Sequence, residues 1–203
     1  MNPAQLALDF EFTPATIEHA DALDAFFARC DVPCHCRYWH FQGDKNAWLD
    51  RCFNAPAENA REFREELQHE SDLMGIVARN PTTAAIHAWL KITPATHVGK
   101  LYQQRLYKNL PCFAGDRSAT FTIGCLLVEP DFRHRGLAHS LLHAAIRAAR
   151  AHGARQIEAF PRRGEHLGDP ELWMGPISIF ERAGFQVVND FAPYPVLRLE
   201  LTD

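Results

Sequence analysis

The sequence lacks the features that mark nucleic-acid-binding and membrane proteins. It has no dense run of basic residues, and its 21 Lys and Arg side chains are outnumbered by 25 Asp and Glu, which gives a formal net charge of -4. Proteins that bind a phosphate backbone show a basic patch, so nucleic acid is not an expected partner. No apolar run approaches the length of a membrane span, and residues 1–12 lack the basic start of a secretion signal. We therefore expect no membrane association and a cytoplasmic location.

The chain also lacks internal repeats, low-complexity linkers and the common nucleotide-binding motifs. Neither Gly-x-Gly-x-x-Gly nor a P-loop Lys-Ser/Thr is present, which argues against an unrelated nucleotide-binding protein. With 203 residues, 47% hydrophobic and 23% charged, the composition is that of an ordinary globular protein. We expect one compact domain spanning residues 1–203.

Cysteine is scattered rather than paired at regular spacings. The six positions are Cys30, Cys34, Cys36, Cys52, Cys112 and Cys125. Without signs of secretion they are interpreted as reduced thiols. His35 and His40 lie near the first three cysteines and raise zinc as an alternative, but the spacing matches no established ligand pattern. We expect no metal.

Hydrophobic periodicity, with Gly and Pro as punctuation, predicts a mixed α/β order of elements. The predicted strands are 6–12, 73–79, 84–92, 119–128, 156–160, 185–188 and 195–201. The predicted helices are 17–30, 44–53, 56–68, a short one at 97–106, 136–152 and 175–183. Asn80-Pro81-Thr82-Thr83 is a turn-forming tetrapeptide that favours a hairpin between the second and third strands. This order implies a mixed sheet with helices.

One segment between a strand and a helix is suited to an anion. It reads Arg133-His134-Arg135-Gly136-Leu137-Ala138. A helix N-terminus offers unpaired N–H groups and the positive end of the helix dipole, and small residues let a diphosphate approach the backbone. The two arginines add positive charge beside the same turn.

Residues 126–138 resemble the acetyl-CoA-binding strand, loop and helix of GNAT acyltransferases, whose signature is Arg/Gln-x-x-Gly-x-Gly/Ala. Ile179-Phe180-Glu181-Arg182-Ala183-Gly184-Phe185 resembles that family's Leu-Tyr-Glu-Lys-x-Gly-Phe segment. Cys34-x-Cys36-x-Tyr38-Trp39 is similar to a segment of a poorly characterised branch of the superfamily. The resemblance is specific over roughly residues 121–188.

The resemblance implies a GNAT acyl-CoA N-acyltransferase fold, α/β in class, with a central mixed and mostly antiparallel sheet flanked by helices. It also implies acetyl-CoA (coenzyme A) as the acyl donor. Its thioester and pantetheine would pair with the backbone of Leu126, Leu127 and Val128, and its pyrophosphate would lie on Arg133, His134, Arg135, Gly136, Leu137 and Ala138. Phe180 would lie beside the same cofactor.

The implied function is N-acetyl transfer to an amine of a small molecule or peptide by direct attack of the amine. The alternative is a catalytically silent CoA-binding or regulatory module of the same fold. The identity of the acceptor stays open. The oligomeric state is open too, with a homodimer among the options.

The proton-transfer residues of the family are not all present. Phe180 stands where the family often has a tyrosine that protonates the leaving thiolate, so either the thiolate leaves unassisted or another hydroxyl, such as that of Ser178 or Tyr38, takes that role. Glu158, inside an apolar strand, is the candidate general base, because a buried carboxylate is costly without a purpose. A structural ion pair with an arginine explains Glu158 equally well.

Two stretches are candidate walls for the acceptor pocket. The first is aromatic, from Tyr38 to Phe41 with Trp48, and the second runs from Tyr102 to Tyr107. Pockets for small molecules are mostly apolar with a few polar groups, which both stretches could provide. Core packing for the first and a solvated helix for the second are the alternatives.

Overall fold

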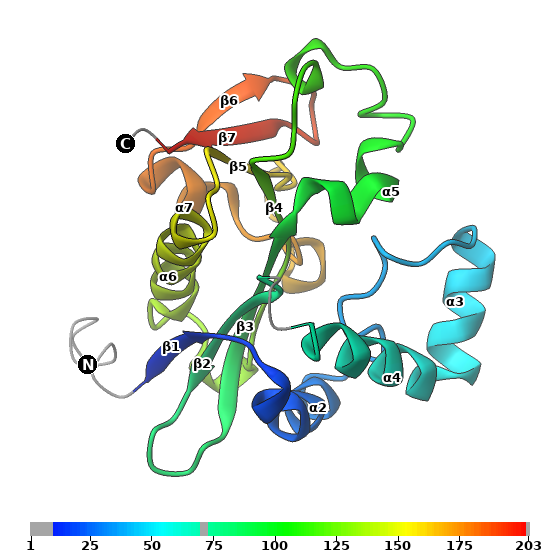
Figure 1. Ribbon diagram of the computed structural model, residues 1–203, viewed down its shortest axis with the longest axis vertical. Coiled ribbons are helices and arrows are strands. Elements are labelled where there is room, and N and C mark those ends of the chain that lie inside the picture. The colour runs from blue at the N-terminus through cyan, green and yellow to red at the C-terminus, as the bar shows by residue number, and fades with distance from the viewer. Residues whose placement is uncertain (1–9, 70–72, 202–203) are drawn as a thin grey trace.

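The computed structural model describes residues 10–69 and 73–201, which form a seven-stranded sheet with helices on both faces (Figure 1). The strands are β1 (Glu11–Pro14), β2 (Gly75–Arg79), β3 (Ile86–Pro94), β4 (Thr120–Val128), β5 (Gln156–Ala159), β6 (Gln186–Asn189) and β7 (Val196–Glu200). Their order in the sheet is β1-β2-β3-β4-β5-β7-β6. Only the β4–β5 pair is parallel, so the mixed and mostly antiparallel sheet is confirmed.

Helices of four to fifteen residues lie on the two faces of this sheet. The α-helices are α2 (Ala20–Arg29), α3 (Lys45–Asn54), α4 (Pro56–Leu67), α5 (Gly99–Tyr102), α6 (Leu137–Ala151) and α7 (Ile177–Arg182). Short 3-10 turns fill Ile17–His19, Ala95–Val98, Pro111–Phe113, Pro130–Phe132 and Asp169–Glu171. In Figure 1, α6 and α7 cover one face, whereas α2, α3 and α4 lie on the other.

The apolar stripe of α6 explains why this helix packs on the sheet. Leu137, Leu141 and Leu142 recur at helical spacing with small alanines, and all of these side chains are buried. They join β-strand residues and Phe180 in one core. A second core, built around Phe26, Phe27 and Trp89, lies between the opposite face and helices α2 and α4. Both faces of the central strands are therefore covered.

The predicted hairpin is confirmed. β2 and β3 pair antiparallel, and the Asn80 side-chain oxygen accepts hydrogen bonds from the backbone N–H groups of Thr82 and Thr83. An Asn that bonds its own turn in this way is a recognised reason for turn formation.

Two predicted elements differ from the observed ones. The short helix expected at 97–106 is helical only over Gly99–Tyr102, because the chain then turns repeatedly, with Tyr107 N–H and Lys108 N–H both donating to the Gln104 carbonyl. Tyr107 is thereby turned inward and buried. The first strand was expected at 6–12, whereas β1 is Glu11–Pro14; residues 6–9 of that prediction lie outside the described residues.

Candidate functional site

The turn before α6 has an open anion-binding geometry. Gly136 is the N-cap of α6 and its φ is +87°, in the left-handed region that favours glycine. Among the described residues, no side chain caps the helix and no atom lies within 4 Å of a Cβ built on Gly136. His134, Arg135 and Gly136 are all exposed. The first N–H groups of this fifteen-residue helix are therefore uncapped and follow an exposed turn.

The other residues predicted to bind the pyrophosphate also take part in the fold. Leu137 is buried in the core and Ala138 is half-buried, so both can offer only backbone N–H groups. Arg133 donates from Nε to the Val128 carbonyl at 3.0 Å and forms an ion pair with Asp169. Arg133 thus ties the end of β4 to the loop between β5 and α7.

β4 and β5 separate along their length, and the loop between β5 and α7 enters the gap. The strands pair only where Thr120, Phe121 and Thr122 face β5. Further along β4, the Leu126 N–H donates to the Trp173 carbonyl at 2.8 Å. The Leu126 amide, which the resemblance assigns to the cofactor, is therefore paired with protein here, while Leu127 and Val128 are half-buried. Their pairing with pantetheine stays a prediction.

A β-bulge interrupts β4 just before this gap. The register with β3 shifts between Lys91 and Ile92, which pair with Cys125 and Ile123, so that Gly124 has no partner. A bulge bends the strand and re-aims neighbouring groups, and such bulges are frequent beside active sites.

A cavity of about 430 Å³ adjoins this part of β4 on the side of α5. Its walls include Trp39, Tyr107, Phe160 and Trp173. The Trp39 and Trp173 rings are stacked, with centroids 5.8 Å apart. The cavity is mostly apolar, with Gln104, Arg105 and an Arg162–Glu171 ion pair as its polar groups. This size and lining are typical of a small-molecule site.

Both candidate acceptor stretches contribute to this cavity. Trp39 lines it and also lies 3.7 Å from the point where a Gly124 Cβ would stand. Gln104, Arg105, Leu106 and Tyr107 line it from the turns after α5. Tyr38 and Phe41, in contrast, contact Trp48 rather than lining the cavity. The cavity thus meets β4 through Trp39 at the bulge and through Trp173 at Leu126.

Glu158 is fully buried and paired through both carboxylate oxygens. Oε1 accepts from Arg198 Nη2 at 2.6 Å, and Oε2 accepts from Arg117 Nη2 at 2.6 Å and from the Tyr102 hydroxyl at 2.7 Å. Burial, and after it the Glu158 charge, raise the pKa of Tyr102 well above its usual range. These contacts favour the structural ion pair for Glu158, and its role as a general base stays a prediction.

Ser178 and Phe180 lie on different sides of α7. Ser178 is exposed, and no hydrogen bond of its side chain is found in the described part of the chain. Phe180 is 0% exposed and packs edge-on against Phe185, with ring centroids 5.4 Å apart. In this conformation Phe180 offers no surface to a ligand. The catalytic role of Ser178 and the cofactor contact of Phe180 both remain predictions.

Metal and membrane features are not found in the described ranges. All six cysteines are free thiols, and no group of three or more His, Cys, Asp or Glu side chains among residues 10–69 and 73–201 is arranged to hold a metal ion. Within those same ranges, no helix combines the length and the apolar character needed to cross a membrane.

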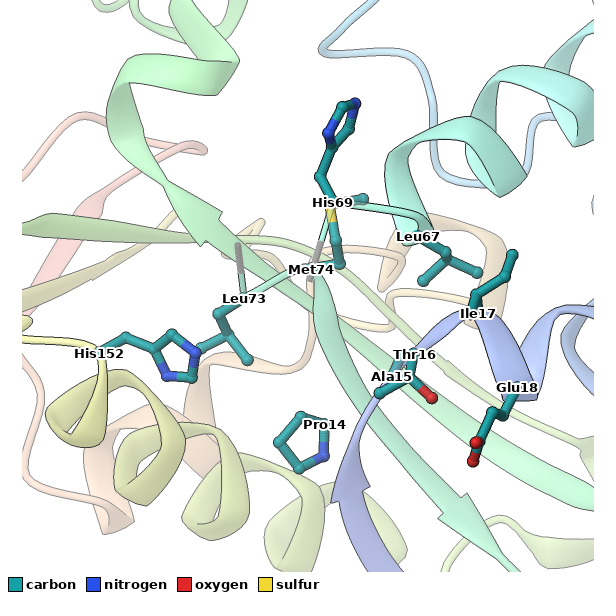
Figure 2. Close-up of a pocket in the computed structure, with 10 residues that line it drawn as sticks. All are labelled: Pro14, Ala15, Thr16, Ile17, Glu18, Leu67, His69, Leu73, Met74 and His152. Carbon is teal, nitrogen blue, oxygen red and sulfur yellow. The ribbon is translucent and has the colours of Figure 1, made fainter. Parts of the chain in front are cut away.

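A second cavity, of about 320 Å³, is remote from the α6 N-terminus (Figure 2). Pro14, the residues that follow β1, and Leu73 with Met74 line it, and His152 reaches it from the opposite end of α6. His69 and Leu73, which flank the residues that the structure leaves undescribed, form part of its wall. This cavity is not part of the candidate site.

The sheet order, the β4–β5 separation and the open helix N-terminus together define an acyl-CoA N-acyltransferase fold. The model of the acetyltransferase (GNAT) family matches residues 46–166, which is more than half of the chain. The protein belongs to this family. Among curated proteins, no sequence matches the chain significantly.

Solved structures share the fold at low sequence identity. The PaiA N-acetyltransferase from Thermoplasma acidophilum, solved in complex with coenzyme A, has a TM-score of 0.55 and 12% identity, over 95% of this chain and 99% of that one. The GNAT domain of S. lividans PAT has a TM-score of 0.57 and 18% identity, over 95% of this chain and 90% of that one. An N-acetyltransferase from Staphylococcus aureus Mu50 has a TM-score of 0.53 and 13% identity, over 95% of this chain and 99% of that one. These likenesses establish the fold and leave the acceptor open.

Proposed function

We propose that this protein is an N-acetyltransferase that transfers an acetyl group from acetyl-CoA to an amine of a small molecule or peptide. The observation that carries the proposal is the N-terminus of α6, which no described side chain caps and which follows the exposed turn at Gly136. Residues 133–138 fit a pyrophosphate because they combine small size, exposed backbone and basic side chains. Acetyl-CoA supplies the activated acetyl thioester.

The cavity of about 430 Å³ is the proposed acceptor site. Its walls Trp39 and Trp173 touch β4 at the bulge and at Leu126, so an amine bound there lies next to the strand that is expected to hold the thioester. The apolar walls bind the body of the acceptor and exclude water, which orients the amine for attack. A silent CoA-binding module would have no need of this acceptor-sized cavity near the strand expected to hold the thioester.

The direct experiment measures acetyl-CoA binding by isothermal titration calorimetry and release of free CoA thiol with a panel of primary amines. We expect micromolar binding and amine-dependent thiol release. Binding without release across the panel would favour the silent module, and no binding would contradict the proposal as a whole.

Replacing Trp173 tests the acceptor cavity separately from the cofactor. We expect Trp173→Ala to raise the KM for the amine by about tenfold, because one apolar wall is lost, while the acetyl-CoA dissociation constant changes less than twofold. The Trp173 contact with β4 runs through its backbone carbonyl, which the substitution keeps. Steady-state kinetics with varied amine and varied acetyl-CoA separate the two effects.

Phe53→Ala is the matched control, because Phe53 is an exposed aromatic residue outside the cavity. Its KM for the amine should equal that of the wild type. An unchanged amine KM in Trp173→Ala would place the acceptor elsewhere.

A further inference from the structure

Lys91 is a charged residue in the middle of the buried strand β3. Its side chain is 0% exposed, between the apolar neighbours Leu90 and Ile92. Burying an ammonium group costs several kcal/mol unless it is well paired. The Nζ atom has no hydrogen-bond partner among the described residues, and its nearest counter-charge is Glu66 Oε2 at 3.6 Å. A lysine kept in such a place needs an explanation.

Four other charged or titratable side chains surround Glu66 and Lys91. Glu66, on α4, is ion-paired with Arg37 and contacts His40 Nδ1 at 3.0 Å. Cys36, from the same loop as His40, and Cys125, on β4, are the other titratable groups near Lys91. Several atoms of this cluster are buried without a hydrogen-bond partner among the described residues: Lys91 Nζ, Glu66 Oε2, His40 Nε2 and Arg37 Nε. The cluster thus keeps unused hydrogen-bonding capacity.

The lysine lies beside the β4 bulge, at a point that a wall of the cavity also contacts. Lys91 pairs with Cys125 beside the bulge, and its Cδ lies 3.6 Å from the position of a Gly124 Cβ. Trp39, a wall of the cavity, lies 3.7 Å from that same position. Lys91 does not line the cavity itself, but it and the Trp39 wall flank the same point of β4.

Burial shifts the protonation balance of Lys91 toward the neutral amine. Burial lowers the pKa of Lys91, and the nearby Glu66 carboxylate only partly opposes this effect. Burial, and after it the Lys91 charge, lower the pKa of His40 to about 4, so His40 is neutral near pH 7. Although burial acts to raise it, the charge of Lys91 and the His40 hydrogen bond hold the pKa of Glu66 well below its usual range. Glu66 therefore remains an anion that can stabilise a protonated Lys91.

We propose that Lys91 is the general base of acetyl transfer, taking a proton from the acceptor ammonium through an intervening water molecule. The inference rests on the proposed function. Glu66 stabilises the resulting Lys91 ammonium, and Arg37 with His40 hold Glu66 in place. A lysine base of this kind is effective when burial brings its proton affinity near the working pH.

The step balances without any further reagent. One proton passes from the acceptor ammonium to the Lys91 lone pair, which leaves a neutral amine. The amine nitrogen then bonds to the thioester carbonyl carbon and the carbon–sulfur bond breaks. The second nitrogen proton goes to the departing thiolate, and Lys91 afterwards releases its proton to water. This route needs no tyrosine at position 180.

The test compares Lys91→Met with the wild type, using an amine that the wild type acetylates. Methionine fills similar volume without a charge. We expect kcat to fall by about 100-fold or more, whereas the acetyl-CoA dissociation constant stays within twofold. In the wild type, kcat should rise with pH through the Lys91 pKa and then level off, because only the neutral amine is active. In Lys91→Met that levelling should be lost.

Lys45→Met is the matched control, since Lys45 is exposed at the start of α3, and its kinetics should equal the wild type. A Lys91→Met enzyme that keeps its kcat, or that loses activity equally at every pH with the profile unchanged in shape, overturns the inference. If that variant does not fold, Lys91→Arg, which keeps the charge but cannot act as a base, is judged by the same criteria. Absence of turnover in the wild type would instead contradict the proposed function itself.

Discussion

Gly136→Glu is expected to weaken acetyl-CoA binding by about 100-fold or more. The new carboxylate would stand at the open N-terminus of α6, where it would bind the N–H groups and repel the pyrophosphate. Because a Cβ at Gly136 meets no protein atom within 4 Å, the substitution does not disturb the core. The left-handed φ of +87° costs a non-glycine residue about 1–2 kcal/mol, a minor part of typical stability. Isothermal titration calorimetry measures the change.

The same helix offers a matched control at its other end. Gly153 follows α6, has a φ of +79°, and a Cβ there would also meet nothing within 4 Å. Gly153→Glu therefore carries the same backbone strain and the same added charge far from the proposed pyrophosphate site. We expect it to bind acetyl-CoA as the wild type does. If folded Gly136→Glu binds equally well, the pyrophosphate is not held at this turn.

Glu158→Gln is expected to lower the free energy of unfolding by about 3–5 kcal/mol. The substitution keeps the shape of the side chain but removes the negative charge between Arg117 and Arg198, whose side chains are 19% and 15% exposed. Arg117 would then be mostly buried without a counter-charge among the described residues, and Arg198 would keep only Glu200, at 3.9 Å. Urea unfolding monitored by circular dichroism measures the loss. Glu181→Gln, at an exposed site on α7, is the control and should change stability little.

The activity of folded Glu158→Gln separates the two interpretations of this residue. If Glu158 is structural, the kcat per folded molecule should stay within about threefold of the wild type, because the proton goes to Lys91. A loss of about 100-fold in a fully folded variant would support the general-base prediction for Glu158 and weigh against Lys91. Measuring Glu158→Gln and Lys91→Met on the same amine shows which of the two residues accepts the proton.

The elements that sequence patterns predicted well are those with a strong local signal. α6 and β4 match their predicted ranges to within about one residue, because an amphipathic stripe and a continuous apolar run are visible in consecutive residues. The turns after α5 were not predicted, since Tyr107 faces inward only because the chain wraps around the cavity. Local periodicity carries no information about that path.

Lys91 was missed although it carried the same signal as Glu158. Each is a charged residue within an apolar strand, and both prove to be 0% exposed. Glu158 is easily recognised as an isolated carboxylate in a short apolar strand. Lys91 follows a tryptophan and a leucine in a longer strand, which hydrophobic periodicity predicts without any role for the lysine. The partners of both, Arg117 and Arg198 for one and Glu66 for the other, come from distant parts of the chain.

The proposed pyrophosphate turn is specified by a short run of consecutive residues. Residues 133–138 are consecutive, so their backbone turn, their small side chains and the helix that follows are specified locally, whatever surrounds them. The proposed acceptor side, in contrast, depends on contacts between distant parts of the chain. Trp39, Lys91 and Trp173 meet at β4 because a strand register, a bulge and a loop inserted between two strands bring them together. Those contacts span long stretches of chain, and no pattern in neighbouring residues encodes them.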